Sequence, residues 1–210
     1  MLRPLPAVFF RTETGREPVR QWLKELPRNE RKIIGEDIMT VQFRWPLGMP
    51  LVDHVGAGIW EVRSKLPTRI ARTLFLCMKA KSSCCMDSLR RQGKPQRRTE
   101  LWLCSAKMPT SKAAKSKNKH RGSSFENFLK KEGLLEDIQV AALKRALALR
   151  VRDLMKQNRL TKSAMAAQMR TSRAAVHRLL DPANTSVTLA TLNRAARSLG
   201  RKVKIELVPA

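Results

Sequence analysis

The sequence lacks long apolar runs and paired cysteine motifs, and it has few acidic residues. No apolar stretch in the 210 residues approaches the ~18 residues that a membrane span needs, and prolines interrupt the short apolar patch at the N-terminus. We therefore expect neither a membrane span nor a signal peptide, and a cytoplasmic protein. The four cysteines form no C-x-x-C pair and have only His120 nearby, so we expect no zinc site and no cofactor.

Acidic residues are strongly outnumbered, with 17 Asp and Glu against 43 Lys and Arg and a net charge of +26. The excess is +5 in residues 1–76, +11 in residues 77–121 and +10 in residues 122–210. Such a charge favours a polyanionic partner, usually nucleic acid, because binding releases counterions. Solubility and a disordered basic linker are the alternatives, and the middle segment fits the second.

Residues 1–76 have the pattern of a small α+β domain. Ala7–Thr12 predicts a strand, and two amphipathic helices are expected at Pro18–Leu26 and Arg28–Phe43. Ile59–Leu66 and Arg69–Leu76 then predict two strands joined by a tight turn. A strand, two helices and an antiparallel run of strands is the order found in small RelE-type toxins.

Three stretches strengthen that likeness: FFRTETGREPVRQWLKELP, IIGEDIMTVQFRWPLGMPLV and IWEVRSKLPTRIARTLF. They resemble the HigB branch of the RelE-like toxins over about residues 7–76. The resemblance implies an mRNA-cleaving ribonuclease that acts with the ribosome and whose basic residues bind phosphate and stabilise charge at the scissile bond. By that resemblance Arg63, Arg69 and Arg72 are the candidate catalytic residues. The alternative is that they are solvated strand residues on a domain with another role.

Residues 77–116 interrupt the pattern, since the segment after Leu76 has a periodicity of neither strand nor helix. We expect it not to complete the sheet, which would leave the toxin domain truncated and its three arginines vestigial. One hypothesis is that Leu76–Lys107 is a toxin sequence read in the wrong frame. Codons rebuilt across neighbouring printed codons permit Leu-His-Gly-Phe from Cys84 to Ser88, similar to the histidine turn of HigB-like toxins. Stop codons in that frame between residues 78 and 96 would exclude the hypothesis.

Residues 117–210 predict a mainly α-helical domain after a polar, basic linker at about 112–122. Ser123 to Glu126 has the character of a capping box, and Glu136–Asn158 is expected to form a long helix. Leu189–Leu199 predicts another helix, with Gly200 as its stop, and Lys202–Val208 alternates as a terminal strand.

The centre of this domain is Leu160–Leu180. Thr161 can cap a helix at Lys162–Met169, and Ser172 can cap a second helix at Arg173–Leu180. Two short helices joined by a tight turn, the second basic on its exposed face, are typical of a helix-turn-helix. The alternative is an ordinary α-hairpin with solvated arginines. Candidates for base contacts are Ser172, Arg173, Ala174 and His177; candidates for phosphate contacts are Thr161, Lys162 and Arg178.

The stretches KNKHRGSSFENFL, TSRAAVHRLLDPANTSVTLATLNRAARSLG and KIELV resemble HigA/Xre-like antitoxins over residues 117–208. The resemblance implies a dimer that binds operator DNA with the second helix of the motif in the major groove. One departure is Arg170, where many such proteins have glycine. If that position needs a positive φ, arginine costs roughly 1 kcal/mol there.

We therefore expect an α+β, incomplete RelE-like domain at residues 1–76, an irregular basic segment at 77–116, and a mainly-α helix-turn-helix domain with a terminal strand at 117–210. The expected function is an antitoxin-type transcriptional regulator fused to an inactive toxin domain. The alternatives are a fused toxin–antitoxin whose ribonuclease half is inhibited by its C-terminal half, and a pseudo-toxin that only positions the DNA-binding half. Expected partners are operator DNA, a second copy of the chain through its C-terminal domain, a HigB-like toxin and, if the toxin half is active, mRNA and the ribosome.

Overall fold

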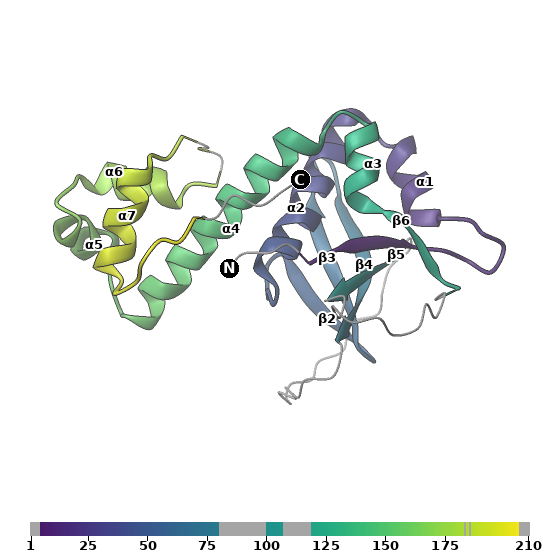
Figure 1. Ribbon diagram of the computed structural model, residues 1–210, viewed down its shortest axis with the longest axis horizontal. Helices are drawn as coiled ribbons and strands as arrows, with labels where there is room; N and C mark the ends of the chain where they lie inside the picture. Colours follow the sequence, from purple (N-terminus) through teal and green to yellow (C-terminus); the bar gives the residue numbers. More distant parts are fainter. Residues whose placement is uncertain (1–4, 80–99, 107–118, 183, 185, 206–210) are drawn as a thin grey trace. The chain divides into compact units, whose positions relative to one another are not determined.

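The computed structural model describes residues 5–79, 100–106, 119–182, 184 and 186–205 (Figure 1). Within these residues seven helices and six strands give a mixed α+β fold, as the sequence predicts at this level. The chain divides into two compact units, and the boundary falls between Ile138 and Gln139. We call them the N-terminal and the C-terminal unit and describe each by itself.

The N-terminal unit is built on one six-stranded sheet with the order β2-β3-β4-β5-β1-β6. All neighbouring strands are antiparallel except β4 and β5, which are parallel. The strands are β1 (Ala7–Phe10), β2 (Val52–Gly56), β3 (Ile59–Lys65), β4 (Ile70–Lys79), β5 (Glu100–Ala106) and β6 (Arg121–Ser124).

Strand β5 corrects the expectation that the segment after Leu76 cannot complete the sheet. It lies between β4 and β1 and pairs with both of them. Its sequence, ELWLCSA, lacks the strict alternation of apolar and polar residues expected of a half-buried strand, so no strand was predicted here. The hypothesis of an out-of-frame segment covers Leu76–Lys107, of which residues 80–99 and 107 lie outside those described.

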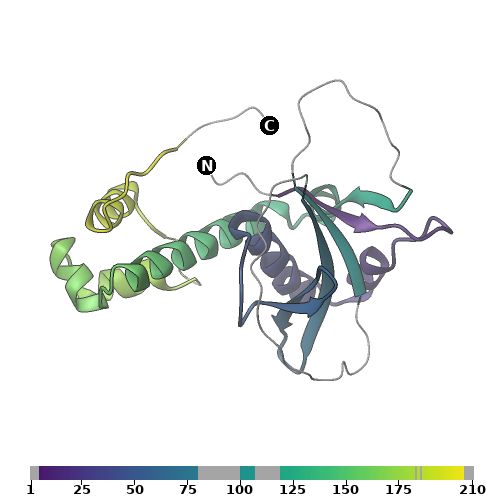
Figure 2. The ribbon, with the colours of Figure 1, turned by 90° about the horizontal axis from the view of Figure 1, so that it is seen from below.

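Two helices, α1 (Pro18–Glu25) and α2 (Arg28–Arg44), cover one face of the sheet (Figures 1 and 2). Val62 and Phe75 point to this face and are buried, together with Ile34 and Ile38 of α2. The ring of Trp45, directly after α2, meets that of Phe75 edge-on with centroids 5.2 Å apart. Since side chains alternate along a strand, the residues next to these buried ones face away from the helices.

Residues 120–138, which the sequence analysis placed with the C-terminal domain, belong to the N-terminal unit. Strand β6 pairs with β1, and α3 (Phe125–Lys131) follows it directly. Phe125 and Phe128 lie edge-on to Phe9 of β1, with ring centroids 5.8 and 5.5 Å away. A β-carbon on Gly35 of α2 would lie 2.6 Å from Ile138 Cδ1, so the side chain of Ile138 packs directly on α2 at this glycine. These residues therefore form part of the N-terminal core.

Glu17, next to the start of α1, fastens β6 to the rest of the unit. Its carboxylate accepts hydrogen bonds from the Ser123 N–H at 2.7 Å and from the Ser123 hydroxyl at 2.6 Å. Burial raises the pKa of Glu17, but the two bonds from Ser123, with smaller contributions from Arg11 and Arg20, outweigh it and lower the pKa below 4.5. Ser124, rather than Ser123, caps α3 by accepting from the Asn127 N–H.

The C-terminal unit consists of most of α4 and three shorter helices. The bounds are α4 (Leu135–Gln157), α5 (Lys162–Gln168), α6 (Arg173–Leu180) and α7 (Leu189–Ser198). Val151 and Met155 of α4 pack with Met165, Val176 and Leu179 in one buried cluster. All four helices were expected from the sequence to within a few residues, because apolar spacing and cap residues mark their ends.

The chain after α7 differs from expectation. Gly200 has a φ of +66° and the Arg201 N–H donates to Ala196 O, so the helix ends as predicted. Residues 202–205, however, are assigned to no strand, and 206–208 lie outside the described residues. A segment forms a strand only where a neighbouring strand pairs with it, and no strand of the described residues pairs with this segment.

Candidate nucleic-acid interfaces

Helices α5 and α6 are joined by a tight turn at Met169–Ser172 and are capped as predicted. The Thr161 hydroxyl accepts from the Ala164 N–H at 3.1 Å, and the Ser172 hydroxyl accepts from the Ala175 N–H at 3.2 Å. Both residues use side-chain oxygens to satisfy backbone donors that a helix start leaves unpaired. Capping therefore accounts for one role of each residue, and their exposure leaves their outer faces accessible.

The apolar and polar faces of α6 separate cleanly. Val176, Leu179 and Leu180 are buried in the helical cluster. Every candidate DNA-contacting residue is exposed: Thr161, Lys162, Ser172, Arg173, Ala174, His177 and Arg178. Five of these belong to α6 and its cap, and the other two belong to the start of α5. No basic residue of this set is buried against the core, so the positive charge faces solvent.

The turn requires an unusual backbone conformation at Arg170, whose φ is +50°. Two hydrogen bonds close the turn, from the Arg170 N–H to Ala167 O and from the Thr171 N–H to Ala166 O, both at 3.0 Å. A left-handed conformation is unfavourable for a residue with a β-carbon. The sequence analysis expected backbone strain at Arg170 if that residue has a positive φ, and the structure meets this condition.

Lys144, which the sequence analysis did not single out, fixes the far end of α6. Its ammonium donates to Leu179 O at 2.8 Å and to Asp181 O at 2.9 Å, and only 6% of the residue is exposed. Burial lowers the pKa of Lys144, and the Asp181 carboxylate offsets part of this effect. Lys144 lies on the same face of α4 as the apolar residues Ala148, Val151 and Met155, and this spacing could have predicted that the lysine is buried.

The three candidate arginines of the N-terminal unit do not form one cluster. Arg63 and Arg72 lie opposite each other on β3 and β4, on the face without α1 and α2. Both contact the buried carboxylate of Glu61, Arg72 at 3.5 Å, and Arg63 also donates to Asp53 Oδ2 at 2.6 Å. Two carboxylates thus balance two guanidinium groups.

Arg69 lies apart, in the turn between β3 and β4. Its Nη2 donates to Glu30 Oε2 of α2 at 2.5 Å. A structural ion pair is therefore a sufficient role for this residue. For the other two, the structure brings together a pair that could contact a phosphate. Arg72 is the more available, since its side chain is 43% exposed and its contact with Glu61 is long.

The acids of this cluster, Asp53 and Glu61, were missed by the sequence analysis. The alternation of β3 was the available signal, because it places Glu61 two residues before Arg63 and hence on the same face. Among the described residues no group of His, Cys, Asp and Glu side chains is arranged to hold a metal ion. The helices of the described ranges include none that is long and apolar enough to cross a membrane.

Comparison with known proteins bears on the N-terminal unit alone. No curated protein and no solved structure gives a significant match to the chain. One family match contains α2, β2 to β4 and the three arginines, and it continues past Leu76, where the likeness to HigB-like toxins ended in the sequence. Residues 21–101 match the family described as phage derived protein Gp49-like, which is linked to RelE- and HigB-like toxins, so this part of the chain is related to toxin–antitoxin systems.

Proposed function

We propose that the protein is an antitoxin-type transcriptional regulator that binds operator DNA through α5 and α6. The observation that carries the proposal is the separation of the two faces of α6, with its apolar residues in the core and Arg173, His177 and Arg178 in solvent. A helix held in this way presents its first turns to the major groove, whose width admits an α-helix. The two capped helices and their turn keep this geometry rigid.

Each exposed residue has a proposed role. Ser172, Arg173, Ala174 and His177 occupy the cap and the outward positions of the first turns of α6, from which side chains reach base edges. Arg173 is the strongest of these, since a bidentate arginine–guanine pair is the commonest specific contact. Thr161, Lys162 and Arg178 flank this surface and are proposed to bind phosphates.

We further propose that two copies pair through the segment after α7. Val203 and Ile205 are 42% and 61% exposed, which is unusual for branched apolar side chains, and they alternate with charged residues. Pairing with the same segment of a second copy would supply the missing strand neighbour and cover both apolar faces. Two recognition helices related by a two-fold axis would then match a palindromic operator.

The experiment titrates the full-length protein against DNA from upstream of its own coding sequence, with a scrambled duplex as the nonspecific competitor and fixed salt. Arg173→Ala is expected to weaken operator binding by about tenfold or more while changing nonspecific binding little. Lys162→Ala should weaken both by similar factors. Arg197→Ala, an exposed arginine of α7, is the matched control and should change neither. Equal losses on both duplexes for Arg173→Ala would assign that residue to phosphate, and failure of the parent to prefer any duplex would refute the proposal.

A second candidate function is cleavage of mRNA by the N-terminal unit, and the presence of β5 supports it. The sequence argument against activity depended on a missing interior strand, and that strand is present. Arg72 keeps donors that could contact a scissile phosphate, although Glu61 and Asp53 offset the local positive charge.

The test of this function requires a fragment that contains the whole N-terminal unit. A fragment ending at residue 110 would lack β6 and α3, so the fragment to express ends at Ile138. Growth arrest that disappears with Arg72→Ala but persists with Arg69→Ala would establish the ribonuclease function. A soluble, folded fragment without effect on growth or on mRNA would leave the regulator as the function. Messenger RNA and the ribosome are proposed as partners only if the N-terminal unit is active, and a HigB-like toxin is a further proposed partner of the chain.

A further inference from the structure

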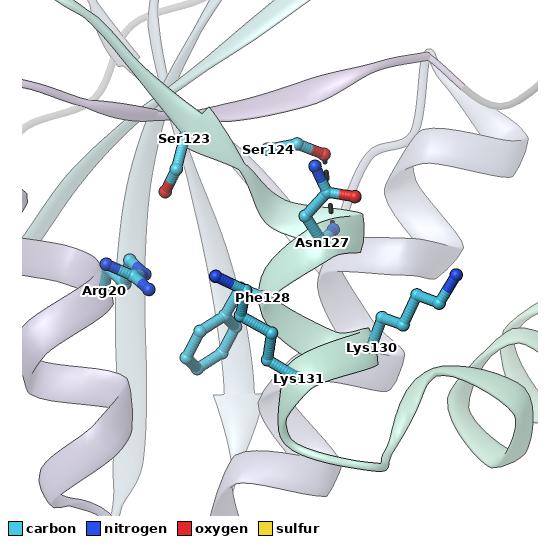
Figure 3. A pocket seen from close by; sticks show the side chains of 7 residues that line it. All are labelled: Arg20, Ser123, Ser124, Asn127, Phe128, Lys130 and Lys131. Atoms are coloured by element: carbon cyan, nitrogen blue, oxygen red, sulfur yellow. Dashed lines mark hydrogen bonds between the residues drawn. The ribbon is translucent and has the colours of Figure 1, made fainter.

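A pocket of about 410 Å³ lies in the N-terminal unit where α1, β6 and α3 meet (Figure 3). Three cationic residues line it: Arg20 of α1 and Lys130 and Lys131 of α3. Ser123, Ser124 and Asn127 add polar groups, and no carboxylate belongs to the lining. The pocket contains none of the arginines of β3 and β4 and none of the residues proposed to bind DNA.

Two of the three cationic side chains that line the pocket point toward each other. The ammonium of Lys131 points toward the guanidinium of Arg20 above the ring of Phe128, whereas the ammonium of Lys130 points away (Figure 3). Two like charges that face the same volume repel each other unless an anion lies between them. Such an arrangement is expected where an anionic ligand completes the site.

The nearest acid, Glu17, offsets only part of this positive charge. Its Oε2 lies 3.7 Å from Arg20 Nη1, and the same carboxylate accepts two hydrogen bonds from Ser123 and pairs with Arg11. Arg20 Nε is buried and, within the described part of the chain, has no hydrogen-bond partner. A buried donor without a partner is costly, so the hydrogen-bonding capacity of the Arg20 guanidinium is not fully used in the free protein.

We propose that this pocket binds a phosphate group. A planar guanidinium and an ammonium that converge on one point are the usual protein donors to phosphate oxygens. The volume lies in the range of ligand pockets, so the site admits more than a bare ion. The phosphate could belong to a small molecule, such as a nucleotide, or to a nucleic-acid backbone.

Binding would also join two parts of the chain. Arg20 belongs to α1, whereas Lys131 belongs to the segment that follows the linker. A bound phosphate would neutralise the repulsion between them and so strengthen the attachment of α3 to the rest of the unit. The inference concerns the N-terminal unit alone and holds whether or not the chain binds DNA.

The experiment observes Arg20 directly, because a chain with this net charge binds phosphate weakly at many places. In the full-length ¹⁵N-labelled protein, the Nε–H signal of Arg20 is identified by its loss in Arg20→Lys. Sodium phosphate is then titrated against sodium chloride of the same ionic strength. We expect a saturable shift of this signal with phosphate and none with chloride.

Two neighbouring lysines provide matched variants. Lys131→Gln is expected to weaken the site about tenfold, the usual effect of one charge-assisted hydrogen bond. Lys130→Gln removes the same charge one residue away and should change the affinity by less than about threefold. Both residues are exposed, so both variants should fold. A shift that does not saturate, or equal losses in the two variants, would overturn the proposal.

The same signal identifies the source of the phosphate. A nucleoside monophosphate and a single-stranded oligonucleotide without terminal phosphates are titrated separately. Saturation of the Arg20 shift by the first at lower concentration assigns a small phosphate ester, and saturation by the second assigns a nucleic-acid backbone. Saturation by neither of them, although inorganic phosphate binds, would contradict a site for a phosphate ester.

Discussion

Replacing Arg170 by glycine is expected to stabilise the C-terminal unit. Arg170 has a φ of +50° in the turn between α5 and α6, and its side chain is exposed with no ion pair among the described residues. Glycine adopts this conformation without steric penalty because it has no β-carbon. The two hydrogen bonds that close the turn are made by the backbone, so the substitution keeps them.

The expected gain follows from two opposing contributions. The left-handed conformation costs a residue with a β-carbon about 1–2 kcal/mol. Glycine loses about 0.5–1 kcal/mol more conformational free energy on folding than other residues do. The difference is a gain of roughly 0.5–1 kcal/mol, which for a unit of this size raises the Tm by about 2–8 °C.

Arg170→Ala is the matched control, since it removes the guanidinium but keeps the β-carbon. Its stability should equal that of the parent within about 0.5 kcal/mol. Arg159→Gly is a second test, because Arg159 has a φ of +52° after the end of α4. Stability is measured from the helical circular-dichroism signal during thermal and urea unfolding of the full chain. If Arg170→Gly is no more stable than Arg170→Ala, the turn does not have the backbone conformation described here.

Three further predictions concern buried contacts. Glu17→Gln should lower the free energy of unfolding of the N-terminal unit by about 1.5–3 kcal/mol at neutral pH, because a charged acceptor is lost. Because folding lowers the pKa of Glu17, its contribution to stability is present above pH 4.5 and is lost as the pH falls through the lowered pKa. The difference in free energy of unfolding between the parent and Glu17→Gln should therefore decrease at acid pH. Lys144→Met should destabilise the C-terminal unit by about 1–3 kcal/mol, because two carbonyls at the end of α6 lose their donor; an unchanged Tm would contradict this role. Gly122→Ala should cost more than Gly35→Ala in urea unfolding, because its β-carbon would meet the backbone oxygen of Phe9 at 2.6 Å rather than the mobile end of a side chain; the reverse order would contradict the packing of β6.

The helices could be predicted because their signals are local. Thr161 and Ser172 act as caps in the structure, and Gly200 adopts the positive φ expected of a helix stop. Apolar spacing placed α1, α2 and α6 with the correct buried faces. The exposed residues of α5 and α6 followed from the same spacing, so the candidate DNA-contacting surface needed no knowledge of distant contacts.

Strands that depend on distant partners could not be predicted in this way. The sequence of β6, RGSS, has no strand signal, and it is extended because β1 and Glu17 supply its partners. Strand β5 was missed because its sequence, ELWLCSA, does not alternate strictly between apolar and polar residues. The balance of Arg63 by Asp53 likewise depends on the pairing of β2 with β3, which no local pattern reveals.

The place of β6 and α3 in the N-terminal core has a consequence for stoichiometry. If these residues belonged to a separate molecule, their attachment would depend on the concentration of that molecule and on its survival. On one chain the attachment is intramolecular, so it does not depend on the concentration of the protein. Dilution therefore leaves the two parts together in a fixed ratio of one to one. Cleavage of the chain between Ala106 and Arg121 would convert the same contacts into an association that dilution can reverse.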